Sequence, residues 1–136
     1  MATALSTTTE LLDGLRDPGN QTAWCALDER MRPVVIAVAR RLGLPADAAE
    51  EVAQHTLVEV FEGYRRGTYD RSRGRLRGWI ICIARHRAID ELRRRDRRGG
   101  HDLLADIPDP QRTSAIWEVV WRAHLARESM RVLRAT

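Results

Sequence analysis

The sequence contains no lysine, and all 23 of its basic residues are arginines. No apolar run is longer than the six residues 34–39, which is far short of the roughly 18 apolar residues that mark a membrane-spanning helix. The N-terminal residues have neither a basic start nor a long apolar stretch, so the sequence shows no secretory signal peptide. We therefore expect a cytoplasmic protein.

Clusters of residues that could bind a metal or cofactor or carry out catalysis are also scarce. The two cysteines, Cys25 and Cys82, can supply neither a disulfide framework nor a structural zinc site. Glu51, His55 and Glu59 share a helix face, but helical di-iron sites use a three-residue Glu–His spacing from two helices, which this sequence lacks. No glycine-rich phosphate loop with a lysine and no nucleophile–base pair stands out. We expect no metal, no cofactor and no catalysis.

The composition predicts one folded domain. The chain has 136 residues, of which 43% are apolar and 31% charged, and this balance excludes a disordered protein. Period-two alternation and hairpin turns are absent, whereas apolar residues recur repeatedly at intervals of three and four. We expect an all-α fold: a compact bundle of about four helices, a linker and one C-terminal helix.

The apolar spacing and the turn residues predict the element boundaries. We expect helices over residues 8–16, 21–42, 48–64 and 75–98, and a last helix from residue 114. Asp47 is the predicted N-cap of the third helix, with Glu50 completing a capping box. The domain then covers 1–98, the linker 99–113 and the C-terminal helix 114–136. That helix carries a coiled-coil-like apolar stripe, which we expect to be exposed, with Trp117 and Trp121 on its flank. The stripe is Ile116, Val119, Ala123, Ala126, Met130 and Leu133.

Charge is unevenly distributed along the chain. Residues 65–98 hold 13 arginines and four acidic residues, a net charge of +9, whereas residues 10–62 have a net charge of −5. Such a cationic block favours binding to a polyanion, most simply a nucleic acid. The alternative is a solvated helix face whose arginines pair with carboxylates elsewhere in the fold.

Two segments carry a specific motif. Residues 47–61 are DAAEEVAQHTLVEVF, and residues 69–94 are YDRSRGRLRGWIICIARHRAIDELRR. Together they resemble region 2 of sigma-70 transcription initiation factors, and most closely the extracytoplasmic-function (ECF) group. Residues 27–42, with a proline inside a helix, resemble the same family. The resemblance covers about residues 8–98 and implies a sigma factor subunit that directs RNA polymerase to promoters.

The resemblance implies two binding surfaces. The polar face of the third helix, Glu50, Glu51, Gln54 and His55, would dock on the β′ clamp helices of core RNA polymerase, and Glu51 and Gln54 match the family's contact positions. The bland alternative is an ordinary solvated face. The loop 65–74 would capture a base flipped out of the non-template strand of the minus-ten element.

The loop and the fourth helix would provide the DNA contacts. Tyr69 could stack on a base or could instead anchor the loop to the bundle. The phosphate-binding candidates are Arg65, Arg66, Arg71, Arg73, Arg75, Arg77, Arg85, Arg87, Arg93 and Arg94. Some of them should pair internally, Arg85 or Arg87 with Asp90 or Glu91 for example. Trp79 and Trp24 fit core packing better than DNA melting.

The sequence departs from the family after the linker. A complete ECF factor has a second helical domain with a helix-turn-helix, and residues 117–133 resemble only the linker's end and the start of that domain. The last helix could fold back on the bundle, self-associate or bind an anti-sigma factor. The alternative function is an arginine-rich helical nucleic-acid-binding adaptor with no polymerase role.

Overall fold

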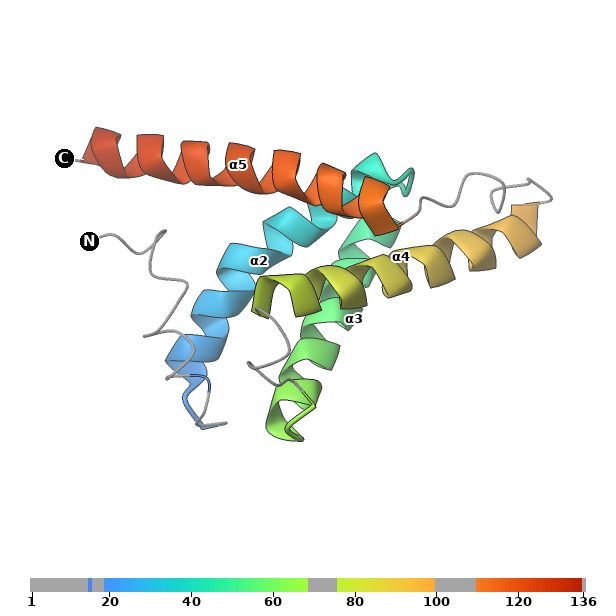
Figure 1. Ribbon diagram of the computed structural model, residues 1–136, viewed down its shortest axis with the longest axis horizontal. Coiled ribbons are helices and arrows are strands. Elements are labelled where there is room, and N and C mark those ends of the chain that lie inside the picture. The colour runs from blue at the N-terminus through green and yellow to red at the C-terminus, as the bar shows by residue number, and fades with distance from the viewer. Residues whose placement is uncertain (1–14, 16–18, 69–75, 100–109, 136) are drawn as a thin grey trace.

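The described structure is entirely helical. The computed structural model describes residues 15, 19–68, 76–99 and 110–135, and no strand occurs among them, which confirms the all-α prediction. None of these helices is long and apolar enough to cross a bilayer. The predicted helix 8–16 lies outside the described residues, except for residue 15, which is helical. The helices are α2 (Gln21–Arg41), α3 (Ala46–Arg65), α4 (Leu76–Gly99) and α5 (Pro110–Ala135) (Figure 1).

A glycine turn separates α2 from α3. α2 begins after Asn20, whose side chain accepts a hydrogen bond from the backbone three residues later. At the other end Gly43 has a φ of 110°, and the N–H groups of Gly43 and Leu44 bond back to the carbonyls of Arg40 (3.1 Å) and Ala39 (3.2 Å). This pair of backbone hydrogen bonds is typical of a helix C-terminus. It places one residue in the left-handed backbone conformation, which glycine adopts most easily because it has no Cβ. The buried Leu44 then fixes the turn onto the core.

The start of α3 differs from the prediction. The helix begins at Ala46, preceded by Pro45, and no side chain caps it, so the expected capping box of Asp47 and Glu50 is wrong. Pro45 has the extended backbone (φ −70°, ψ 167°) of a residue before a helix, and its fixed φ lets the helix start earlier. Asp47 lies instead in the first turn, where its carboxylate interacts favourably with the positive end of the helix dipole.

α3 and α4 lie antiparallel. Trp79 near the start of α4 touches Gly63 near the end of α3, whereas Arg95 near the end of α4 reaches Asp47 in the first turn of α3. α2 packs along the other side of α3, and the three helices share one apolar core. Its largest fully buried aliphatic side chains on these helices are Leu27, Met31, Val34, Val35, Val60 and Ile80.

α5 packs on this bundle through the flank of its apolar stripe. It begins at Pro110, not near residue 114, which suits proline because the first helical residue needs no hydrogen-bonded N–H. Trp117, Val120 and Trp121 are buried, whereas Val119 and Leu133 of the stripe are 55% and 66% exposed. The two indoles therefore lie on the face that packs on α2 and α4, and much of the aliphatic stripe stays on the surface.

Candidate functional site

The exposed side of α3 carries the four predicted polymerase-contact residues. Glu50, Glu51, Gln54 and His55 are all exposed and recur at the one-, four- and five-residue spacing of a single helix face. None of them forms an ion pair with another described residue. The structure therefore brings these four side chains together on an exposed surface, and none of them is ion-paired to another described residue.

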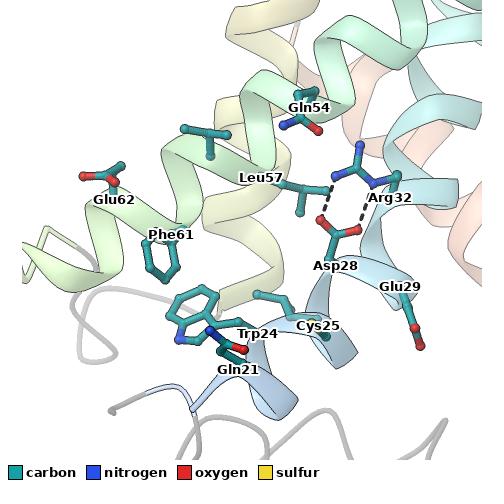
Figure 2. A pocket seen from close by; sticks show the side chains of 12 residues that line it. Gln21, Trp24, Cys25, Asp28, Glu29, Arg32, Gln54, Leu57, Phe61 and Glu62 are labelled. Carbon is teal, nitrogen blue, oxygen red and sulfur yellow. Dashed lines mark hydrogen bonds and ion pairs between the residues drawn. The ribbon is translucent and has the colours of Figure 1, made fainter. Parts of the chain in front are cut away.

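A groove lies beside this face, between α2 and α3 (Figure 2). It has a volume of about 640 Å³, and Gln54 and Val58 of α3 line it. Val58 is 49% exposed although it is apolar. At the far end, the Trp24 ring meets the Phe61 ring edge to face at 4.7 Å. The groove gives the polar face of α3 an apolar floor.

One wall of the groove is a fixed ion pair. Arg32 donates two hydrogen bonds to Asp28, four residues earlier on α2, at 2.8 and 2.7 Å. The hydrogen bond that Arg32 donates to Asp28 raises the pKa of Arg32, against a smaller opposing effect of burial. The groove and Val58 are not among the contacts predicted from the sequence. The position of Val58, an apolar residue four positions after Gln54 on an otherwise polar face, could have indicated them.

The arginines at the end of α3 are exposed but not isolated. The Arg65 guanidinium lies 3.9 Å from Glu62 and 5.6 Å from the centre of the Phe61 ring. Arg66 lies 3.5 Å from the same carboxylate and is 73% exposed. The other loop candidates, Tyr69, Arg71, Arg73 and Arg75, lie outside the described residues.

Two arginines of α4 pair with carboxylates of neighbouring helices. Arg87 lies 2.6 Å from Glu59 of α3, so it pairs across the bundle and not with an acidic residue of its own helix. Arg77 lies 3.0 Å from Glu118 of α5 and 5.6 Å from the centre of the Trp121 ring. Both guanidinium groups are only partly exposed and have carboxylate partners within the fold.

Glu91 organises the end of α4. It accepts hydrogen bonds from Arg94 and from Arg95, which confirms that this carboxylate is an arginine partner. The hydrogen bond from Arg94 holds the pKa of Glu91 below its ordinary value, and the two guanidinium charges add to it against burial. The hydrogen bond to Glu91 and the charge of that carboxylate raise the pKa of Arg94, and the charge of Glu51 on α3 adds a smaller effect in the same direction.

Two cations of α4 face solvent without such partners. Arg93 and Arg97 are exposed and form no ion pair with the residues that the structure describes. Arg85 is half-buried. Of the predicted phosphate-binding residues on α4, Arg93 is therefore the most accessible, and Arg97 one turn later adds a second free charge.

Both surfaces lie within a segment that matches a known family. Residues 27–98 match the model of sigma-70 region 2. The chain belongs to the sigma-70 family. Over 101 residues it is 33% identical to the ECF RNA polymerase sigma factor RpoE of Cereibacter sphaeroides, an alignment that covers 74% of this chain and 54% of that protein. No solved structure matches the chain significantly.

Region 2 accounts for most of the described bundle. The match begins inside α2 and ends in the last turn of α4, so it contains the polar face of α3, the arginines of α4 and most of the residues that line the groove. α5 follows the matched segment. The chain spans about half the length of the curated sigma factor that it matches. The resemblance to region 2 of the ECF group is thereby confirmed.

Proposed function

We propose that this chain is the part of a sigma factor that binds core RNA polymerase and recognises and melts the minus-ten promoter element. The observation that supports the proposal most directly is the polar face of α3, which is exposed, forms no ion pair with the residues that the structure describes and borders an apolar groove. A surface of this composition suits a protein partner, because apolar contacts supply affinity and polar contacts supply orientation.

The polymerase contact is assigned to α3 and the groove. The partner would be a pair of helices, the β′ clamp helices of the polymerase. Glu51 and Gln54 would contact polar and cationic side chains of that pair, and Val58 would pack against an apolar one. Because Glu51 is exposed in the free chain, its carboxylate can attract a cationic group of such a partner.

The promoter contact is assigned to the arginines that remain accessible. Arg93 and Arg97 at the end of α4, with Arg65 and Arg66 at the end of α3, would bind phosphates of the melted region. Phosphate contacts fix the position of the DNA but carry no sequence information. Sequence would be recognised through a flipped base held by the loop 65–74, most of which lies outside the described residues.

A pull-down with core RNA polymerase tests the first contact. Glu51→Arg introduces a positive charge at the centre of the face, where it would repel the cationic side chains of the partner. It should weaken binding about tenfold or more, which corresponds to about 1.4 kcal/mol. Gln54→Ala should weaken it less. Gln111 is exposed on α5, so Gln111→Arg and Gln111→Ala are matched controls that should bind as the parent does. Equal retention of all four variants would contradict the polymerase contact.

Selection of bound DNA separates the proposal from its alternative. If the chain acts as a sigma factor, its complex with core polymerase should retain one short motif of the non-template strand in preference to scrambled single-stranded DNA. An arginine-rich adaptor would bind both equally, in a salt-sensitive way, and would not bind polymerase. That result would replace the proposed function with the adaptor.

A further inference from the structure

Arg77 belongs to the cationic block but lies under α5. Its guanidinium is 3.0 Å from a carboxylate oxygen of Glu118 and 5.6 Å from the centre of the Trp121 ring. The two charged side chains are 37% and 42% exposed, so solvent and ions reach the pair. A phosphate that binds this guanidinium would compete with the carboxylate of α5 for the same charge.

The ion pair is not what holds α5 in place. Trp117 is completely buried, and Val120 and Trp121 are buried beside it. α5 makes its more extensive contact with α2 and a smaller one with α4. A half-exposed ion pair adds little to stability, whereas burial of two indoles contributes much more. The charge of Glu118 is therefore not required for docking.

We propose that α5 lowers the nucleic-acid affinity of α4, because Glu118 competes with a DNA phosphate for the guanidinium of Arg77. This inference rests on the proposed function, since it concerns the regulation of the same DNA-binding helix. An event that moves α5 away from α4 would release one cation at the start of α4. The ligand class is the phosphodiester backbone, and the competing group is a carboxylate of the chain itself.

The experiment measures binding of the full chain to a fluorescent single-stranded DNA of mixed sequence, about 16 nucleotides long. Glu118→Gln should bind more tightly, and the gain should be about 2.6-fold larger at 50 mM salt than at 200 mM, the increment of about one single-strand phosphate contact. Arg77→Ala should reduce affinity more in the Glu118→Gln background than in the parent chain.

Glu128→Gln is the matched control. It removes the same charge from α5, but Glu128 pairs with Arg131 of its own helix. It should reproduce at most the small, nonspecific gain that any lost negative charge gives. Thermal unfolding of Glu118→Gln should match the parent chain, which shows that α5 still packs.

The outcomes distinguish failure of the competition by Glu118 from failure of the proposed DNA contact. Unchanged affinity of Glu118→Gln, or a gain that persists when Arg77 is also replaced, would overturn the inference while the proposed function stands. The same holds if Glu128→Gln gives an equal gain. Absence of binding by the parent chain and by every variant would instead contradict the proposed DNA contact, and the inference with it.

Discussion

The two functional helices use their charged residues differently. On α3, Glu50, Glu51 and His55 are exposed and unpaired among the described residues. On α4, by contrast, Arg77 and Arg87 are held by carboxylates of neighbouring helices. Charged residues thus form an open surface on one helix and a partly neutralised one on the other.

The difference shows how little a charge count says about accessibility. The net charge of +9 over residues 65–98 overstates the free positive charge, because Glu59 and Glu118, which neutralise two arginines, lie outside that segment. Conversely, the acidic N-terminal part has an exposed polar face on α3, because only some of its carboxylates turn toward α4. Pairing across helices, not local composition, decides which charged side chains are neutralised and which stay exposed.

The packing between α3 and α4 offers the largest expected effect. A Cβ at Gly63 would lie 2.8 Å from the Trp79 ring, so Gly63→Ala should destabilise the fold by roughly 1–2 kcal/mol despite the better helix propensity of alanine. Gly78 on α4 has nothing within 4 Å of the same position. Gly78→Ala should stabilise by about 0.5–1 kcal/mol. Urea unfolding measures both, and equal shifts would contradict the close contact.

The accessibility of the arginines predicts the next effect. Arg93→Ala should weaken binding to single-stranded DNA about fourfold near 150 mM salt, the value of one phosphate contact. Arg94→Ala should weaken it less, because Glu91 already holds that guanidinium. Fluorescence anisotropy over a range of salt concentrations measures the affinities. A larger loss for Arg94→Ala would mean that DNA displaces the internal carboxylate.

The ion pair between α3 and α4 should have a smaller effect. Glu59 and Arg87 are about 40% exposed, so their coupling should amount to roughly 0.2–1 kcal/mol. A double-mutant cycle with Glu59→Gln and Arg87→Gln, followed by urea unfolding, measures it. Zero coupling would place Arg87 among the cations that are free to bind phosphate.

The pH dependence of stability provides the smallest test. The folded pKa of Glu91 lies below its ordinary value of 4.5 because Arg94 donates a hydrogen bond to it. Its contribution is therefore complete above the unfolded pKa and is lost as the pH falls through the lowered folded value. Glu91→Gln should lose less stability than the parent between roughly pH 6 and pH 3. Identical acid unfolding curves would show that Glu91 does not contribute.

The helices and the family could be predicted from local sequence. Spacing of apolar residues and the glycine turn at Gly43 gave α2, α3 and α4 to within a few residues, because these features act over one or two turns. The cap of α3 was predicted wrongly, because Pro45 and Asp47 compete for the helix start. Which face of α5 packs on the bundle was left open, because that choice depends on a contact between distant helices, made here by Trp117 and Trp121.

The sequence by itself determined the all-α fold, the sigma-70 family and the set of candidate side chains, since each follows from residue types at short spacing. Only the tertiary structure decided which of those side chains are accessible. The partners of Arg77 and Arg87 are 41 and 28 residues away in the chain. Contacts at that separation follow from how helices pack, and no local pattern encodes them.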